Sequence, residues 1–459
     1  MMRNFIWHFR FYRGALGTAR TVFWLLVRPV MDLLRPSTWH FYRADKGFKL
    51  PPKQGMRVML FSTDCALGSG AFRCCFGLAK TLREKGVDVF VVTSWYGDGR
   101  ALLADEKIPF TCVPLGGWIV PNEMDIKTQS RVIGAMAIRN IVATHRVRRL
   151  IRKYDVDVVH CNTIYSYMGA LAAFIEKRPV VWHIRESLVE TKRHIVNERL
   201  GYELLNHAHS VLCVSDWIRR EFMPFASKPR FLAVHDGVDP RRFYDGDHTI
   251  LLKKPYTFVM MGNFQPKKCQ LEFSRACVTL YQHGFRDFRV WFIGGKGIEE
   301  KCGSIFDAGG LHDIVTYWGF QSEPEKIVRK ADIAFMCSRA EAFGLVTVEA
   351  MLSGCLLIGS NTAGTPELIR HGETGLLFEF KPDECPDLVE KMRYAVEHPD
   401  EVRRMAAAGR EYMRQHKTLE VNADEVIEVY MSALDQRMKN ISSIENSQNK
   451  GNFTRRCSS

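Results

Sequence analysis

The stretch ADIAFMCSRAEAFGLVTVEAMLSG, residues 331–354, combines a strand pattern and a helix pattern around a short polar loop. It begins with an apolar run of strand length, after which Leu345, Val348 and Leu352 recur at the i, i+3 and i+7 positions of one helix face. Gly354 suits the end of that helix, because glycine is favoured just after a helix C-terminus. Strand, loop and helix in this order predict one βα unit of a parallel sheet.

Two carboxylates interrupt this apolar stretch, Glu341 in the predicted loop and Glu349 in the predicted helix. In an open parallel sheet, ligands lie at the carboxyl ends of the strands, and a helix that starts there directs N–H groups toward an anion. Glu349 leans back toward the helix start, because helical side chains tilt toward the N-terminus. Both acids can therefore face the hydroxyl groups of one ligand, with the amides of residues 344–346 facing a phosphate. The alternative is a solvated Glu341 and a Glu349 on the wet face of the helix.

Apolar runs of strand length alternate with helical stretches in two series along the chain. The first series begins with MRVMLFS at residues 56–62 and the second with YTFVMMGN at residues 256–263. This alternation predicts an α/β protein with two doubly wound, Rossmann-like domains that face a cleft. The predicted parts are an amphipathic segment at 1–45, an N-terminal domain at 53–237, a polar linker at 238–255, a second domain at 256–400, C-terminal helices at 401–437 and a disordered tail at 438–459.

Composition limits the classes of partner. The chain of 459 residues has a formal net charge of +13, which favours a phosphate-bearing substrate, an anionic membrane or nucleic acid. Nucleic acid is disfavoured, because no sheet motif interleaves aromatic and basic residues. The thirteen cysteines contain no C-x-x-C pair, which argues against a zinc site, and no metal is predicted. Their odd number, without a cleavable signal peptide, predicts reduced thiols in a cytoplasmic protein.

Residues 1–45 carry an amphipathic pattern. Apolar residues recur at alternating spacings of four and three from Phe5 to Leu33, and six arginines from Arg3 to Arg35 fall on another side of the same helical wheel. The central uncharged run, TVFWLLV, is far shorter than the roughly 20 residues that span a bilayer. We therefore predict peripheral contact with the anionic inner face of the cell membrane. An arm packed on the protein itself is the alternative.

Several motifs lie in order along residues 56–431. Seven residues separate Glu341 from Glu349, and AGTPELI and HGETGLLF follow them. The motifs upstream are WHIRE at 182–186, VSDWIRREF at 214–222, HDGVD at 235–239, GNFQPKKCQ at 262–270 and FIGGKG at 292–297. This ordered set resembles the signature of the family-4 retaining glycosyltransferases, which have the two-domain GT-B fold.

The resemblance implies roles for residues of the second domain. In the family, the first glutamate contacts hydroxyls of the donor sugar and the second contacts the nucleoside ribose, and these roles carry over to Glu341 and Glu349. Lys268 matches the family's phosphate-binding lysine, whose charge offsets that of the departing diphosphate. The sugar and the diphosphate are expected at the backbone of four donor-binding residues, Phe343, Gly344, Leu345 and Val346.

The sequence departs from the family pattern at Asn263, where an arginine is expected. Asparagine can donate a hydrogen bond to the donor there, but it supplies no charge. Either another cation substitutes, for example Lys267 or Lys296, or turnover is low.

In the first domain, the resemblance concerns a glycine loop and a histidine. Gly68 and Gly70 match the family loop that approaches the donor phosphates, although G-S-G alone is an ordinary turn. His183 resembles the family's active-site histidine beside the sugar. A histidine near the end of a strand can equally be a structural residue, and His160 is a second candidate.

Three further residues receive broader expectations. Arg185 and Glu186 either extend the acceptor side or pair with each other. Glu367, in the AGTPE motif, is expected in a turn and helix cap near the ribose or base.

Together these expectations describe a metal-independent retaining hexosyltransferase with Glu341, His183 and Lys268 as catalytic residues. Its donor is a nucleotide-sugar, which acts as co-substrate without a further cofactor, and its acceptor is a hydroxyl of a glycan or lipid-linked glycan in cell-surface polysaccharide synthesis. Two alternatives share the fold. One is a catalytically weak nucleotide-binding partner protein, and the other is a nucleotide-sugar epimerase or synthase.

Overall fold

The computed structural model describes residues 48–456, except residues 95–96, 115–116, 166, 197, 245–253, 296 and 382–384. The chain forms two compact units. The first contains the chain up to Val214, Ile218–Val234 and the C-terminal segment from Ala423, and the second contains Ser215–Trp217 and His235–Asn422. The predicted amphipathic segment at 1–45 lies outside the described residues, as does half of the predicted linker at 238–255.

A seven-stranded parallel sheet forms the centre of the first unit, in the order β3-β2-β1-β5-β6-β8-β9. Its strands are β1 (Arg57–Ser62), β2 (Asp88–Thr93), β3 (Phe110–Cys112), β5 (Val158–Cys161), β6 (Val180–Ile184), β8 (Ser210–Cys213) and β9 (Arg230–Ala233). Leu60 of β1 pairs with Val91 of β2 on one side and with His160 of β5 on the other. The short strands β4 (Ile119–Pro121) and β7 (Arg193–Ile195) form a separate antiparallel pair.

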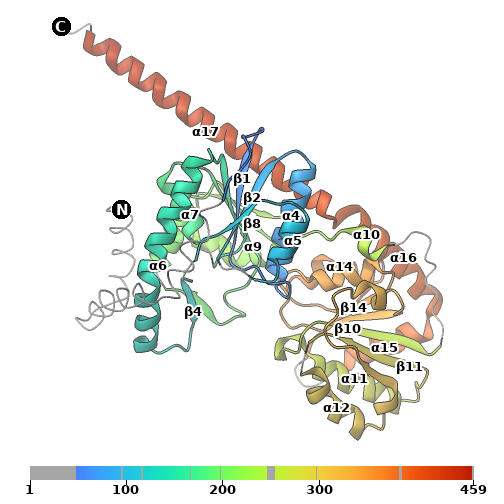
Figure 1. Ribbon diagram of the computed structural model, residues 1–459. Coiled ribbons are helices and arrows are strands. Elements are labelled where there is room, and N and C mark those ends of the chain that lie inside the picture. Colours follow the sequence, from blue (N-terminus) through green and yellow to red (C-terminus); the bar gives the residue numbers. More distant parts are fainter. Residues whose placement is uncertain are drawn as a thin grey trace. The chain divides into compact units, whose positions relative to one another are not determined.

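Helices cover both faces of this sheet (Figure 1). α4 (Gly70–Glu84) and α5 (Arg100–Asp105) lie on one face, and α6 (Ile126–Lys153) and α7 (Tyr167–Ile175) lie on the other. α8 (Glu198–Asn206) precedes β8, and α9 (Asp216–Phe222) follows it. The chain returns to this unit through α17 (Leu419–Arg456), whose Ala423, Val426, Val429 and Tyr430 join the apolar core beneath α4.

The second unit contains a six-stranded parallel sheet in the order β12-β11-β10-β13-β14-β15. Its strands are β10 (Tyr256–Met261), β11 (Phe288–Ile293), β12 (Val315–Tyr317), β13 (Ile333–Met336), β14 (Leu356–Ser360) and β15 (Leu376–Phe378). α11 (Gln270–Gln282) and α12 (Ile298–Ala308) lie on one face, and α14 (Leu345–Leu352) and α16 (Pro399–His416) lie on the other (Figure 1). The remaining α-helices are α10 (Pro240–Phe243), α13 (Glu325–Val328) and α15 (Pro386–Glu397).

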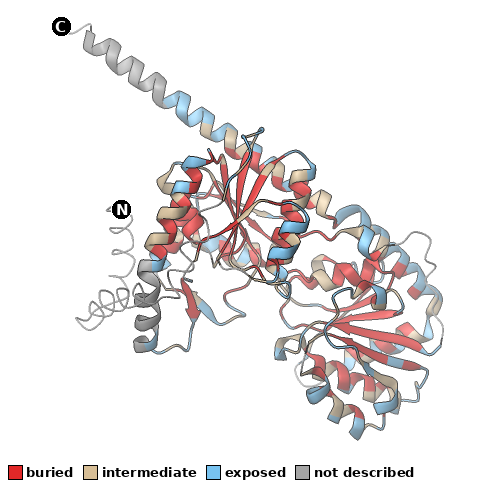
Figure 2. Ribbon diagram, viewed as in Figure 1, coloured by how far each residue is buried: buried red, intermediate tan, exposed pale blue. Residues whose placement is uncertain are grey.

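Burial explains why the strands have continuous apolar sequences. Figure 2 shows most strands of both sheets buried, because helices cover both faces. The twelve described cysteines are all buried. In the part of the chain that the structure describes, no helix is both long enough and apolar enough to cross a membrane.

The strands predicted from apolar runs are present in both sheets. The prediction missed the separate pair β4 and β7 and, within the two sheets, β3, β9 and β15. All three lie at sheet edges, where β3 and β15 have three residues each and β9 has four. Such short segments are below the length at which an apolar period can be recognised.

Two local predictions differ from the structure. α10 forms within the predicted linker at 238–255, with Asp239 as its N-cap. α17 continues to Arg456, where the composition of residues 438–459 predicts a disordered tail. The segment contains no proline, so nothing in the backbone prevents the helix from continuing.

Candidate active site

The strand order of the second sheet reverses between β10 and β13. From β10 the chain adds β11 and β12 on one side, and it then returns to add β13, β14 and β15 on the other side. Ligands of open parallel sheets bind at such a point, outside the carboxyl ends of the strands. The loop after β10 carries Asn263 and Lys268, and the loop after β13 carries Glu341. Topology thus brings together Lys268 and Glu341, which are 73 residues apart in the sequence.

Lys268 and Glu341 form an ion pair between these two loops, from Lys268 Nζ to Glu341 Oε2. Each side chain is 18% exposed, so the pair is largely shielded yet accessible. The backbone joins the same loops, because the amide of Arg339 donates to the carbonyl of Lys267 at 2.9 Å. Ser338 Oγ donates to Glu341 Oε2 at 3.4 Å. The site therefore combines a cation suited to phosphate with a carboxylate that accepts hydrogen bonds from hydroxyls.

Gly344 forms the turn from this loop into α14. Its φ is 92° and its ψ is 70°, and a Cβ there would lie 3.1 Å from both Glu341 Cγ and Thr347 Oγ1. Glycine is therefore favoured at this position for two reasons: the positive φ, and the lack of room for a Cβ between Glu341 and Thr347. Leu345 and Val346 begin the helix, where N–H groups lack partners within the helix. Thr347 Oγ1 is buried without a hydrogen-bond partner among the described residues, so it offers one more polar atom at the helix start.

Glu349 and Phe343 are both buried. Glu349 lies within α14 and is 2% exposed, so the alternative that placed it on the wet face of the helix is wrong. The ring of Phe343 stacks on the ring of His235 with centroids 5.5 Å apart. Because its side chain packs against the protein, any contact of Phe343 with a donor falls to its backbone.

Glu367 is engaged with the protein. It accepts hydrogen bonds from the amides of Asp216 at 2.8 Å and Trp217 at 2.9 Å, and its carboxylate lies 3.0 Å from His235 Nε2. Burial alone would raise the pKa of Glu367, but these hydrogen bonds lower it below its ordinary value. Lys417 Nζ lies 2.6 Å from the other ring nitrogen of His235. The carboxylate of Glu367 therefore holds the ring of His235 in place. The sequence had suggested that Glu367 lies near the ribose or base of a donor.

Asn263 also uses its side chain within the protein. Its Oδ1 accepts a hydrogen bond from the amide of Gly295 at 2.8 Å, and its backbone carbonyl accepts one from Gln270 Nε2 at 3.1 Å. The residue at the expected arginine position therefore joins the loop after β10 to the loop after β11. Of the two cations considered as substitutes, Lys267 is partly buried, and Lys296 lies outside the described residues.

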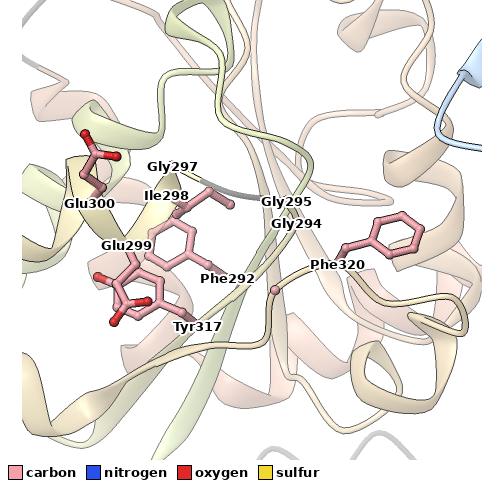
Figure 3. Close-up of a pocket in the computed structure, with 10 residues that line it drawn as sticks. Phe292, Gly294, Gly295, Gly297, Ile298, Glu299, Glu300, Tyr317 and Phe320 are labelled. Carbon is pink, nitrogen blue, oxygen red and sulfur yellow. The ribbon is translucent and has the colours of Figure 1, made fainter.

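A pocket of about 650 Å³ opens at the carboxyl ends of β11 and β12 (Figure 3). Glycine backbone, three aromatic rings and two glutamates line it. Phe292 and Tyr317 stack with ring centroids 5.5 Å apart, and Phe320 is 67% exposed. Gly295 lines the pocket and also contacts Asn263, so the pocket adjoins the loop that carries Lys268.

In the first unit, the corresponding reversal of strand order lies between β1 and β5. The loops after these strands meet where Thr63 Oγ1 lies 3.3 Å from Thr163 Oγ1. Ser69 caps α4, and Gly68 and Gly70 on either side of it are exposed. A Cβ on either glycine would meet nothing within 4 Å. The glycine loop therefore lies at a ligand-binding edge, with open space around both glycines.

His183 lies on β6 and is fully buried. Its ring centroid is 5.4 Å from that of His160, whose Nδ1 lies 2.7 Å from the hydroxyl oxygen of Tyr430. Burial, and then the charge of Arg185, lowers the pKa of His160 to about 3 and the pKa of His183 well below its ordinary value. Both rings are therefore neutral at physiological pH. The structure places His183 in the interior of the first unit, as a structural histidine would be.

Glu186 follows β6 at the same edge of the sheet. It accepts hydrogen bonds from the amides of Ile164 at 3.1 Å and Arg185 at 2.8 Å. Burial raises the pKa of Glu186 to about 7. This carboxyl group can therefore change its charge near neutral pH.

Comparison with known proteins identifies the family. Residues 247–412 match the family described as "Glycosyl transferases group 1", and residues 68–242 match "Glycosyltransferase Family 4". N-acetyl-alpha-D-glucosaminyl L-malate synthase from Bacillus anthracis is 30% identical over 322 residues, which are 66% of this chain and 78% of that protein. This chain belongs to the family-4 glycosyltransferases.

Other relatives of this glycosyltransferase differ in coverage. A GDP-mannose-dependent alpha-(1-6)-phosphatidylinositol monomannoside mannosyltransferase from Mycobacterium tuberculosis is 27% identical over 58% of this chain and 74% of that protein. D-inositol 3-phosphate glycosyltransferase from a Mycobacterium species is 29% identical over 244 residues, and the chain spans 51% of its length.

Solved structures share the fold of this glycosyltransferase at low sequence identity. Anabaena HepE in complex with UDP and glucose matches 82% of this chain and 100% of that chain with a TM-score of 0.67, at 19% identity. A glycosyltransferase from Rickettsia africae matches 83% of this chain and 99% of that chain with a TM-score of 0.67, at 17% identity. The predicted GT-B fold of two Rossmann-like units is confirmed.

Sequence reasoning missed three features of the glycosyltransferase's candidate site. Thr347 lies between the two glutamates, and a hydroxyl near the start of an apolar helix was a usable signal. Phe320 is the last residue of the apolar run IVTYWGF at 314–320, which predicts a strand, and an aromatic residue at the carboxyl end of a strand was another usable signal. His235 gave no signal of its contact with Phe343, because that contact joins segments distant in the sequence.

Proposed function

We propose that this glycosyltransferase moves a hexose from a nucleotide-sugar donor to a hydroxyl of a glycan or lipid-linked acceptor, with retention of anomeric configuration. The ion pair between Lys268 and Glu341 carries the proposal. The pair lies where the strand order of the second sheet reverses, next to the start of α14. A cation, a carboxylate and free helix amides at one place suit a ligand that combines phosphates with sugar hydroxyls.

In the proposed reaction, the bond from the anomeric carbon to the diphosphate breaks as the acceptor oxygen forms a bond to that carbon. The acceptor's proton leaves with the diphosphate. Lys268 offsets the negative charge that grows on the diphosphate, and the amides at Leu345 and Val346 support it. Glu341 accepts hydrogen bonds from hydroxyls of the donor sugar and orients it. The proposal assigns Glu349 to the ribose and uses no metal or further cofactor.

Relatives support the choice of donor and acceptor classes. Solved structures of HepE contain UDP-glucose or UDP, and the name of the mycobacterial mannosyltransferase specifies a phosphatidylinositol monomannoside. We place the present enzyme in cell-surface polysaccharide or glycolipid synthesis, peripherally at the inner face of the membrane. The membrane part of this proposal depends on the amphipathic pattern of residues 1–45.

The test is release of nucleoside diphosphate by the purified full chain from a panel of UDP-, GDP- and ADP-sugars, with and without membrane lipid extract. We expect release from one donor class, increased by the extract and reduced at least about a hundredfold in Glu341→Gln. Glu390→Gln, an exposed carboxylate of α15, is the matched control and should keep the wild-type rate. Full activity of Glu341→Gln would contradict the proposal.

A second candidate, a nucleotide-binding protein with weak turnover, is favoured by one observation. Asn263 accepts a hydrogen bond from the amide of Gly295, and it supplies no charge at the position where the family has an arginine. Nucleotide binding without release from any donor would support this candidate. Production of a free altered sugar without acceptor would instead indicate an epimerase.

A further inference from the structure

We propose that the pocket in Figure 3 receives the base of the donor nucleotide and that Glu299 makes it select guanine. The inference rests on the proposed function, because it assumes a nucleotide-sugar donor. It adds the donor's base, which the glycosyltransferase fold leaves open.

The lining of the pocket combines glycine backbone with aromatic side chains. Glycine backbone at Gly294, Gly295 and Gly319 lines it, and Phe320 at its edge is 67% exposed and able to cover one face of a ring. Gly294 permits close packing of the loops, because a Cβ there would lie 2.2 Å from the carbonyl oxygen of Gly262. The flat face of a base can therefore lie against backbone on one side and an aromatic ring on the other.

Position connects this pocket to the Lys268–Glu341 pair. The pocket opens at the ends of β11 and β12, and β11 is the direct neighbour of β10. Gly295 in its lining donates to Asn263, which lies in the same loop as Lys268. A nucleotide with its diphosphate at Lys268 can therefore extend its base toward Gly295 and the pocket.

The two glutamates of the pocket differ in their surroundings. Both lie in the first turn of α12, where an acid is ordinarily favoured by the helix dipole. Glu300 pairs with Lys301 at 3.1 Å. Glu299 has no ion pair among the described residues and lies beside Tyr317. Glu299 is therefore the carboxylate that is available to a ligand.

Tyr317 lines the same pocket as Glu299 and lies near it. The hydroxyl of Tyr317 is buried without a hydrogen-bond partner in the described chain. Burial, then Cys302 and Glu299, raises the pKa of Tyr317, so the hydroxyl keeps its proton. Because this hydroxyl makes no hydrogen bond to Glu299, the carboxylate keeps both oxygens for a ligand in the pocket.

A carboxylate in this position favours guanine over the other bases. Guanine presents two neighbouring donors, N1–H and the 2-amino group, which match the two oxygens of a carboxylate. Uracil presents one N–H between two carbonyl oxygens, which a carboxylate repels. Adenine presents its amino group next to an acceptor nitrogen. Loss of one charge-assisted hydrogen bond corresponds to about a tenfold to hundredfold loss of affinity.

The experiment is calorimetric titration of the full chain with GDP, IDP, UDP and ADP. Inosine lacks only the 2-amino group of guanosine, so IDP isolates that contact. We expect GDP to bind at least about tenfold more tightly than IDP or UDP. Glu299→Gln should reduce the ratio of GDP to IDP affinity to about threefold or less, because an amide oxygen accepts without a charge. Glu390→Gln, which changes an exposed carboxylate of α15 that does not line the pocket, is the matched control, and it should leave that ratio unchanged while reporting the general effect of removing one negative charge.

Two results would overturn the inference. One is wild-type binding of UDP as tight as that of GDP, and the other is an unchanged ratio of GDP to IDP affinity in Glu299→Gln. Either would leave the proposed glycosyl transfer intact, because that function is measured separately by donor cleavage and its loss in Glu341→Gln. Absence of binding by all four nucleotides would overturn both proposals.

Discussion

Replacement of Gly344 by alanine tests whether the turn before α14 positions Glu341. Gly344 has a φ of 92°, so any L-residue there is strained. Its new Cβ would lie 3.1 Å from Glu341 Cγ and from Thr347 Oγ1. Both separations are shorter than the 3.5–4.0 Å that is typical of carbon contacts, so the neighbours must move by about a few tenths of an ångström.

The structure separates two costs of this change. A non-glycine residue in the left-handed region costs about 1–2 kcal/mol, and the two close contacts add about 1–3 kcal/mol. The free energy of unfolding of the second unit should therefore fall by about 2–5 kcal/mol. Since a 1 Å misplacement of a reacting group can reduce the rate about a hundredfold, a shift of a few tenths should reduce it about tenfold.

The assay pairs urea unfolding with nucleoside diphosphate release, measured where the variant is fully folded. Gly372→Ala is the matched control. Its φ is 77°, and a Cβ there would meet nothing within 4 Å. It should lose about 1–2 kcal/mol of stability and keep the wild-type rate. The reasoning is refuted if Gly344→Ala keeps the wild-type rate, or if Gly372→Ala loses as much activity as Gly344→Ala.

Two further predictions concern the buried histidines of the first unit. Tyr430→Phe removes the hydroxyl 2.7 Å from His160 Nδ1 and should reduce the free energy of unfolding of this unit by about 1–3 kcal/mol, measured by urea titration at neutral pH; an unchanged midpoint would contradict it. Because burial lowers the pKa of His160 from 6.5 to about 3, the unfolded chain binds a proton below pH 6.5 that the native chain excludes. Stability should therefore fall by about 1.4 kcal/mol per pH unit for this group as pH decreases from 6.5 toward 3, and His160→Gln should lose that part of the slope.

The βα units could be predicted because each carries its pattern locally. The apolar run before Glu341 and the helical spacing after it are enough to place β13 and α14, and Gly354 follows that helix with a φ of 88°. The ordered motifs also identify the loops that topology brings together at Lys268 and Glu341. These features depend on residues near one another in the sequence.

Features that depend on distant packing could not be predicted in the same way. The burial of His183 and His160 involves Tyr430, which is 270 residues from His160 and returns on α17. The hydrogen bond from the amide of Gly295 to Asn263 likewise joins two loops that become adjacent through the pairing of β10 with β11. A sequence motif gives the identity of such residues, but the fold decides whether their polar atoms face a ligand or the protein.

The central claim is that Lys268 and Glu341 act together on the donor. The most direct measurement is a double-mutant cycle on the rate of nucleoside diphosphate release, with Lys268→Met, Glu341→Gln and the combined variant at equal folded fractions. The account predicts a loss of at least about a hundredfold for each single variant, with the combined variant no more than about tenfold below the slower of the two. A wild-type rate in either single variant, or fully additive losses in the combined variant, would contradict it.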